Sequence, residues 1–467
     1  MNTQQQDDRD TYRLIITRCD SSEVLCLPDG PFYSLPSVDI PRWQRVAEPI
    51  RNAVKTHLNL DAYSLFTCPC ETPATETPRT LFQAMECVRA DGPVSPTALW
   101  VPIPSLMIDS FRDAHDFRGI CNALSALSRD TETGNEGPFA KSGWLRDLCT
   151  WIAQHIEPLN ARLTGNFRQL NASSSFSLIR FETTDTALWF KAVGPPNLHE
   201  YAISLTLARL LPSYVPKVLA AKLEWHGWLM DDGGGTTLDD VQDPSAWQTA
   251  LTTLANLQID SIGLEVELLE AGCRDLRLAA LLELVDPFLD AMADLMKQQS
   301  KAPPPILSRQ QLSDMSAVLK DALQCLAALR IPDALGHSDF NPGNIIVGLE
   351  RCTFLDWAEA YLGHPFLTFE YFLAHLRKDY PQLAHLESGL RTSYSRIWNS
   401  VASPAQIAQA YSFSPLVAVY AYAVSGNAWR DPERLKVPGF PGYLRSLTRR
   451  MKQEADSMQR RRIECLN

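Results

Sequence analysis

The chain has 467 residues, of which 45% are apolar and 21% are charged, a composition typical of a globular protein and not of a disordered or fibrous one. At roughly 150 residues per domain, this length predicts about three folding units, each large enough to bury its own core. Acidic residues exceed basic ones by 54 to 43, and the net charge of -11 offers no broad basic surface for phosphates, so we expect no nucleic-acid partner.

The eleven cysteines are odd in number and scattered, which predicts reduced thiols in a cytosolic protein. The opening residues MNTQQQDDRD are polar and acidic, and nothing in them resembles a signal peptide. The longest apolar run, residues 413–424, is shorter than the roughly 20 residues that a membrane span needs. We therefore expect a buried helix there, no membrane partner and a cytoplasmic location.

The first third of the chain alternates short strands with one helix. Strands are predicted over residues 12–17, 23–27, 32–38, 81–88 and 99–103, with an amphipathic helix over 42–58. This order predicts a separate α+β domain over residues 1–126, followed by a polar linker over 127–143. The domain resembles a Nudix-type fold but lacks the glutamate-rich metal box of those hydrolases, so we expect it to bind a ligand or a protein partner.

Beyond the linker, the pattern changes from strands to helices. A helix starts near residue 144, a hairpin is predicted over 176–181 and 187–193, and a helix and a further strand follow before the loop DDGGG. Residues 144–232 therefore predict a small β-rich lobe. Residues 233–467 are mostly helical apart from a hairpin at 344–357 and predict a large helical lobe.

The most informative segment is residues 335–365. Asp339 is followed five positions later by Asn344 in a loop made tight by Pro342 and Gly343, and the next strand delivers Asp356 at its end. Phosphoryl transfer from ATP uses such groups, because one carboxylate accepts the hydroxyl proton while an amide and a second carboxylate hold Mg²⁺ against the phosphates. The alternative is an ordinary turn rich in Asn, Pro and Gly.

The residues His337-Ser338-Asp339, Asn344 and Asp356-Trp357 are similar to the H-x-D-x-x-x-x-N and D-W motifs of the aminoglycoside phosphotransferase and choline kinase family. The resemblance covers roughly residues 165–425. It implies a two-lobed protein-kinase-like fold that is preceded here by the α+β domain. It also implies that Asp339 is the catalytic base and that Asn344 and Asp356 bind the metal, whereas we expect His337 to hold the loop structurally.

The same resemblance assigns a nucleotide-binding role to Lys191, which lies in an apolar strand and would reach the α- and β-phosphates of ATP. A lysine in such a strand alternatively extends from an edge into solvent. Glu200 would be the ion-pair partner of Lys191. Because Asn197 precedes it by three residues, Glu200 alternatively belongs to a capping box and returns to the N-cap amide.

The remaining nucleotide contacts are predicted in two loops. Ser173, Ser174 and Ser175 form a serine-rich turn that could cover the phosphates without a G-x-G-x-x-G motif, or simply be a turn. The adenine is expected near Met230, where a strand precedes the glycines of residues 233–235. Those glycines are equally typical of a hinge.

Two features bear on the molecule that accepts the phosphoryl group. Acids in the large lobe suit a cationic acceptor such as an aminoglycoside or an amino alcohol, although solvated helix faces also carry acids; these residues are Glu283, Asp286, Asp290, Glu359 and Glu370. The stretch 445–462 is strongly basic, which is typical of a solvated terminal helix, with an anion or partner contact as the alternative.

The sequence therefore predicts a cytosolic enzyme that uses ATP and Mg²⁺ to phosphorylate a hydroxyl of a small molecule. A nucleotide-binding pseudokinase with a regulatory or scaffolding role and a kinase that acts on protein side chains are the alternatives. The sequence does not identify the acceptor, the oligomeric state or the choice between ATP and GTP.

Overall fold

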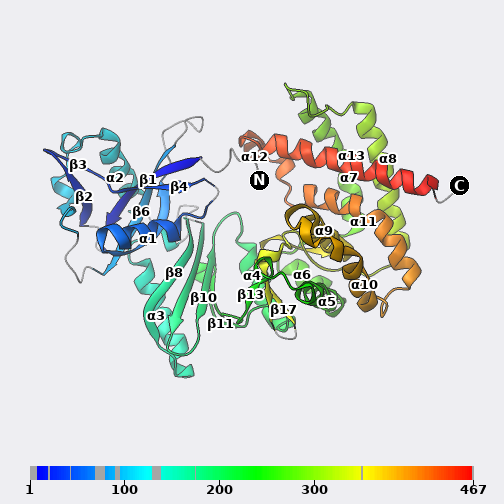
Figure 1. The fold of residues 1–467 in the computed structure, drawn as a ribbon, viewed down its shortest axis with the longest axis horizontal. Helices are drawn as coiled ribbons and strands as arrows, with labels where there is room; N and C mark the ends of the chain where they lie inside the picture. The colour runs from blue at the N-terminus through cyan, green and yellow to red at the C-terminus, as the bar shows by residue number, and fades with distance from the viewer. Residues whose placement is uncertain are drawn as a thin grey trace. The chain divides into compact units, whose positions relative to one another are not determined.

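Figure 1 shows the computed structural model of the chain, which describes residues 8–18, 22–42, 44–68, 79–89, 95–128, 138–173, 175–348 and 351–464. The chain forms two compact units. The first comprises Met1–Tyr201 and Lys217–Asp232, and the second comprises Ala202–Pro216 and Gly233–Asn467. Each unit has its own buried apolar core.

The first unit begins with a mixed β-sheet. Its strand order is β3-β2-β1-β6-β5, with β4 also paired to β1 and β7 to β2, and β1 runs parallel to β6. The strands are β1 (Arg9–Thr17), β2 (Glu23–Asp29), β3 (Phe32–Ser34), β4 (Ser37–Pro41), β5 (Asp61–Cys68), β6 (Thr80–Arg89) and β7 (Leu99–Pro102). Helices α1 (Ala47–Leu58) and α2 (Ala114–Leu127) belong to the same region.

Side chains along β1 alternate between two apolar clusters, because successive residues of a strand point to opposite faces. Leu14 and Ile16 pack in a cluster with Ile50 of α1, whereas Ile15 lies in a second, larger cluster. Both faces of the sheet are therefore covered, which explains why this strand is apolar at consecutive positions.

A second, antiparallel sheet lies in the same unit and has the strand order β11-β12-β10-β9-β8. Its strands are β8 (Leu163–Ser173), β9 (Phe176–Thr183), β10 (Leu188–Val193), β11 (Val218–Lys222) and β12 (Gly227–Asp231), and helix α3 (Trp144–Ile156) precedes them. Strands β9, β10 and β12 lie where the sequence predicts strands. The sheet confirms the predicted β-rich small lobe.

The two sheets share one apolar core, which includes Ile15 from the first sheet and Phe190 from the second. A polar contact links strands β5 and β8. The Gln169 side chain donates from Nε2 to the Ser64 carbonyl oxygen at 2.7 Å and accepts from the Ser64 amide at 2.8 Å. Arg51 of α1 adds a hydrogen bond of 2.6 Å to the Phe167 carbonyl oxygen. The N-terminal domain and the small lobe are therefore packed into one unit.

The second unit is mostly helical. Its helices are α4 (His199–Leu210, which begins in the first unit), α5 (Pro244–Asp260), α6 (Glu265–Glu270), α7 (Leu278–Lys297), α8 (Arg309–Ala328), α9 (Phe366–Asp379), α10 (Glu387–Trp398), α11 (Pro404–Val424), α12 (Pro432–Lys436) and α13 (Phe440–Glu464). Its strands are β13 (Thr236–Thr237), β14 (Arg274–Leu276), β15 (Ala334–His337), β16 (Ile345–Val347), β17 (Cys352–Phe354) and β18 (Ala360–Gly363). They form two small sheets, β13-β16-β17 and β14-β18-β15.

Helix α11 lies in the core of this unit and packs against α8, α9 and α13. It starts nine residues before the predicted run because Ser403 and Gln406 form a capping box, with Pro404 in the first turn. Within the described chain, α11 is the one helix long and apolar enough to cross a membrane, and 56% of its most apolar window is buried inside the protein. Core helices of globular proteins meet the same criterion.

Other predicted boundaries were wrong for local reasons. The strand predicted over 32–38 is two strands, β3 and β4, because Pro36 between them cannot donate a ladder hydrogen bond. The helix predicted from residue 42 begins at Ala47. Strands β5, β8 and β11 were not predicted as strands.

His364 connects β18 to α9 and is fully buried. Its Nδ1 accepts a hydrogen bond from the Phe366 amide at 3.3 Å, and its Nε2 has no hydrogen-bond partner in the described part of the chain. Burial lowers the pKa of His364 to about 3, because its packed surroundings cannot solvate a charged imidazolium.

We expect His364 to make folding sensitive to acid. Its pKa is about 3 when folded and about 6.5 when unfolded, so its contribution to stability is complete above pH 6.5 and is lost as the pH falls toward 3. Between pH 7 and pH 5 the loss is about 2 kcal/mol. Denaturant unfolding at both pH values should show this loss in the wild type and a smaller pH dependence in His364→Asn.

The exposed His385 provides the control. His385→Asn should retain the wild-type pH dependence, because the loss is assigned to the buried ring of His364. Equal pH dependence in wild type and His364→Asn would contradict the assignment.

Candidate active site

The predicted catalytic residues lie on a short strand–loop–hairpin segment of the second unit. Strand β15 ends at His337, the loop carries Asp339, and a helical turn over Pro342–Asn344 leads into β16. Strand β17 then ends just before Leu355 and Asp356. The Leu355 amide donates to the Asn344 carbonyl oxygen at 2.9 Å, so the hairpin brings the start of one strand beside the end of the next.

His337 holds the loop from within the core. Its Nε2 donates to the Leu355 carbonyl oxygen at 2.9 Å, and its Nδ1 accepts from the Asp339 amide at 3.1 Å. The His337 amide donates to Thr368 Oγ1 at 2.9 Å. A ring that donates at one nitrogen and accepts at the other is a neutral imidazole, so these contacts support the structural role that the sequence predicts.

The Asp339 carboxylate is oriented by three side chains. Asn344 Nδ2 donates to Oδ2 at 3.1 Å and also to the Asp339 carbonyl oxygen at 2.9 Å. Asn341 Nδ2 donates to Oδ1 at 3.0 Å, and the Tyr371 hydroxyl donates to the same oxygen at 3.3 Å. Both carboxylate oxygens are therefore fixed in direction, as a positioned general base requires.

Asp356 lies immediately after this hairpin with a left-handed backbone conformation (φ 62°). This conformation is uncommon for a residue with a Cβ, and such residues concentrate at functional sites because the surroundings must hold them in place. The sequence predicts that Asp356 follows the end of a strand. The structure shows in addition that the backbone of Asp356 is strained.

Asn344 and Asp356 fit a magnesium site by donor chemistry. Asn344 uses its Nδ2 for Asp339, so its amide oxygen faces the opposite side of the group, and Asp356 adds a carboxylate. Both are the hard oxygen donors that Mg²⁺ prefers. Among the described residues, no cluster of three or more His, Cys, Asp or Glu side chains could hold a metal. A metal here would therefore need water and phosphate oxygens as well, which is the usual way Mg²⁺ is held.

In the first unit, Lys191 lies on β10 opposite Trp228 of β12 and is 5% exposed. Its Nζ contacts the carboxylate of Glu200, which is 2% exposed on α4. The Phe176 ring lies 5.3 Å from the same nitrogen. The expected pair of Lys191 and Glu200 is thus in contact, while its role toward a nucleotide stays a prediction.

The serine turn joins β8 to β9. The Ser175 amide donates to Ser173 Oγ at 3.3 Å, and the Ser175 carbonyl oxygen accepts from the Gly194 amide at 2.7 Å. Ser174 lies outside the described residues. Met230 lies on β12, paired with Trp189 of β10, and is partly buried. Neither location tests a contact with a nucleotide.

Sequence reasoning missed two residues that contact the Asp339 side chain. Asn341 lies within the predicted motif, and its position two residues after Asp339 is a signal for such a hydrogen bond. Tyr371 lies on α9, and nothing in the sequence indicates that it reaches Asp339. The aromatic residues Trp398 and Trp429 are buried in the core, which is the ordinary location that the sequence analysis allowed for aromatic residues.

Residues 167–395 match the sequence model of the phosphotransferase enzyme family. This part of the chain is a phosphotransferase domain. The match confirms the resemblance that residues 337–357 carry, and with the two sheets and the helical unit it confirms the predicted α+β, two-lobed kinase-like fold with an additional N-terminal region. The chain is therefore a phosphotransferase enzyme.

Solved structures with similarity to the chain share little sequence with it. An ethanolamine kinase from Plasmodium vivax is 15% identical with a TM-score of 0.44, covering 71% of this chain and 93% of its own. A choline kinase from Cryptosporidium parvum is 11% identical with a TM-score of 0.47, covering 68% and 97%. A macrolide 2'-phosphotransferase from Brachybacterium faecium is 15% identical with a TM-score of 0.39, covering 64% and 97%. No curated protein matches the chain.

The backbone just before the loop that carries Asp339 leaves no room for a side chain at Gly336. A Cβ there would lie 2.0 Å from the Tyr361 ring, whose hydroxyl is hydrogen-bonded to Thr368 at 2.8 Å. We expect Gly336→Ala to displace Tyr361 and to cost at least about 1–3 kcal/mol of folding free energy, as overpacking does.

The measurement is denaturant unfolding of Gly336→Ala beside Gly389→Ala. A Cβ at Gly389, on helix α10, meets no atom within 4 Å, so this control should match or slightly exceed wild-type stability. If Gly336→Ala were as stable as the control, the close contact with Tyr361 would not be a constraint.

Proposed function

We propose that this enzyme transfers the γ-phosphoryl group of ATP to a hydroxyl of a small molecule, with Mg²⁺. The observation that carries the proposal is the orientation of Asp339. The amides of Asn344 and Asn341 fix both of its carboxylate oxygens, and Asn344 retains its amide oxygen for a cation. One hydrogen bond thus links the proposed base to a proposed metal ligand. Phosphoryl transfer uses both of these groups.

In the proposed reaction, Asp339 accepts the proton of the acceptor hydroxyl. The acceptor oxygen forms a bond to the γ-phosphorus as the bond between that phosphorus and the β,γ-bridging oxygen breaks, and ADP leaves with the electron pair. Asn341 and Tyr371 keep the carboxylate directed during this step. Mg²⁺ bound by Asn344 and Asp356 would supply positive charge to the phosphate oxygens.

The nucleotide roles of the first unit rest on the family resemblance and on chemistry. Lys191 would bind the α- and β-phosphates. Glu200, whose buried carboxylate forms an ion pair with Lys191, would hold the lysine side chain in place. Ser173 and Ser175 would offer hydroxyl and amide donors to the phosphates. The strand at Met230 would border the adenine. We propose ATP as the donor, with GTP as the alternative to test.

The acceptor and the location of the protein follow from broader arguments. The neighbours named above are kinases and phosphotransferases of small molecules by name, which favours a small-molecule acceptor over a protein side chain. The cysteines that the structure describes are free thiols, which favours a reducing compartment such as the cytoplasm. Of the acids that suggested a cationic acceptor, Asp286 is ion-paired with Lys320 at 2.6 Å and Glu370 with Arg391 at 2.7 Å.

Changing Asp339 to Asn should abolish phosphoryl transfer while nucleotide binding survives, because the amide cannot accept the hydroxyl proton. General-base catalysis typically contributes 10²–10⁴-fold, so the expected loss in kcat is at least about a hundredfold. An ADP-release assay with an acceptor panel measures it. Asp314→Asn, on the exposed face of α8, is the control and should keep full activity. Near wild-type turnover by Asp339→Asn would exclude Asp339 as the base.

A thermal-shift titration tests the metal ligand separately. Mg·ATP at 100 times its Kd should stabilise the wild-type protein by about 2.7 kcal/mol. We expect Asp356→Ala to lose most of this shift, since the carboxylate that holds the metal is gone. A shift of wild-type size in Asp356→Ala would contradict the metal assignment, and no shift in either protein would favour the pseudokinase alternative.

A further inference from the structure

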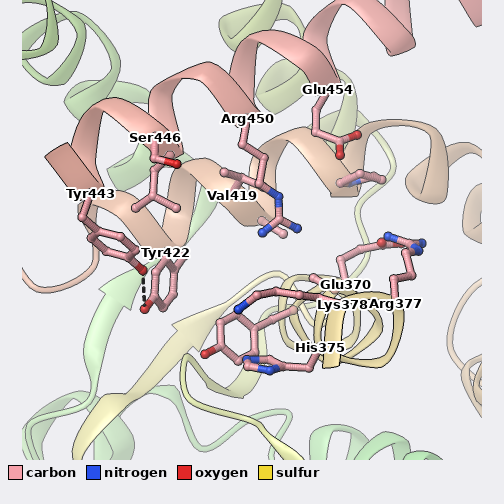
Figure 2. A pocket seen from close by; sticks show the side chains of 15 residues that line it. Glu370, His375, Arg377, Lys378, Val419, Tyr422, Tyr443, Ser446, Arg450 and Glu454 are labelled. Atoms are coloured by element: carbon pink, nitrogen blue, oxygen red, sulfur yellow. Dashed lines mark hydrogen bonds between the residues drawn. The ribbon is translucent and has the colours of Figure 1, made fainter. Parts of the chain in front are cut away.

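The second unit contains a cavity of about 330 Å³ between α9, α11 and α13, whose lining residues are drawn in Figure 2. Its size lies in the range of small-molecule sites. Tyrosine rings and apolar side chains line one end: Tyr371 and Tyr422 lie with ring centroids 5.3 Å apart, and Tyr443 donates a hydrogen bond of 3.0 Å to the Tyr422 hydroxyl. Val419 adds an aliphatic contact.

The cavity is adjacent to the proposed catalytic base. Tyr371 lines it, and the hydroxyl of the same side chain donates to Asp339 Oδ1 at 3.3 Å. Burial is the main cause that raises the pKa values of Tyr371 and Tyr422, and the negative charge of Asp339 adds to it. Both hydroxyls therefore stay protonated and able to donate at neutral pH. A molecule in the cavity lies one side chain away from the base.

The charges of the cavity are unevenly compensated. Glu370 is bound by Arg391 at 2.7 Å, and Arg377 is bound by Glu387 at 2.5 Å. Arg450 has no ion-pair partner among the described residues. It projects from α13 toward the end of α9 that carries Lys378 (Figure 2).

The lining carries two acids, Glu370 and Glu454, against three cationic side chains, Arg377, Lys378 and Arg450, so positive charge is in excess. Glu454 lies one helical turn further along α13, at the end of the cavity where Arg377 lies (Figure 2), and its charge acts on Arg377. Lys378 lies 3.6 Å from Asp379, in a pair that is largely solvated. His375 is hydrogen-bonded to the same Asp379 at 2.8 Å. The cavity therefore combines an aromatic end near the base with a cationic group that can bind an anion.

We propose that this cavity binds the phosphoryl acceptor and that the acceptor is a hydroxylated aromatic carboxylic acid or a similar aromatic anion. Its ring packs against Tyr371 and Tyr422, its hydroxyl is directed toward Asp339, and its anionic group binds Arg450. The proposal rests on the phosphotransferase function proposed above and names the substrate class of that site. It differs from the cationic acceptor that the acid content of the sequence suggested, because Glu370, one of the acids behind that expectation, lines this cavity and is already bound by Arg391.

Three compounds that share a hydroxymethylbenzene core and carry an anionic, a neutral or a cationic group at the para position test the proposal: 4-(hydroxymethyl)benzoate, 4-(hydroxymethyl)benzamide and 4-(hydroxymethyl)benzylamine. Their binding to the full chain is measured by calorimetry, and their kcat/KM by ADP release. We expect the benzoate to bind up to about fivefold more tightly than the amide, and the benzylamine to bind most weakly, because Arg450 is exposed and a solvated ion pair contributes at most about 1 kcal/mol.

Arg450→Gln should remove the preference for the benzoate over the amide in both measurements. Arg460→Gln, an exposed arginine on the same helix that does not line the cavity, should keep it. Equal binding of benzoate and amide, tightest binding of the benzylamine, no binding of any of the three, or an Arg450→Gln variant that retains the preference would each overturn the proposal.

The outcomes separate this proposal from the proposed function. If Mg·ATP binds and Asp339→Asn loses turnover of another acceptor while the benzoate preference is absent, only the substrate class is wrong. If the benzoate binds through Arg450 while Mg·ATP does not bind, the cavity is an anion-binding site but the proposed phosphoryl-transfer mechanism is wrong.

Discussion

The positions of the proposed base and metal ligands depend on one buried imidazole ring. His337 donates to the carbonyl oxygen of Leu355 and accepts from the amide of Asp339, so it connects the loop that carries the base to the residue that precedes Asp356. Only a neutral imidazole offers one donor and one acceptor in this geometry. Because the ring is 1% exposed, water has little access to replace either bond. The site is therefore set by backbone groups of three short segments, and the functional side chains are left to act on ligands.

The first unit shows a comparable dependence on one polar side chain. Strand β8 is an edge strand of the small-lobe sheet. An open edge strand presents unpaired backbone groups that can pair with a strand of another chain. Gln169 of that strand instead binds both backbone groups of Ser64 in the N-terminal domain, and the two sheets bury a common apolar cluster. This packing gives the N-terminal domain a structural role as cover for the small lobe. A ligand or protein partner for it, like its Nudix-type resemblance, stays a prediction.

The sequence predicted those parts of the site that are formed by residues close together in the chain. Asp339, Asn344 and Asp356 lie within 18 residues of one another, and the turn and strands between them determine that they meet. Contacts between distant segments were not predictable: Gln169 and Ser64 are 105 positions apart, and Tyr371 reaches Asp339 from another helix. Strand β5 was missed because its residues are buried on both faces and show no alternation, and β8 because its polar residues resemble a loop. The predicted bounds of strands were wrong where a single residue interrupts the strand, as Pro36 does between β3 and β4.

Net composition and local charge lead to different expectations for the acceptor. The chain carries a net charge of -11, and its acids alone suggest a site for cations. In the structure, however, an acid held by an arginine no longer presents its full charge to a ligand, as the pairs Glu370 with Arg391 and Glu387 with Arg377 show. What a ligand senses is the group that remains uncompensated within a Debye length of about 8–10 Å. In the cavity beside Asp339 the cationic side chains outnumber the acidic ones, so the proposed preference for an anionic acceptor follows from how local charges are placed and paired and not from the net charge of the chain.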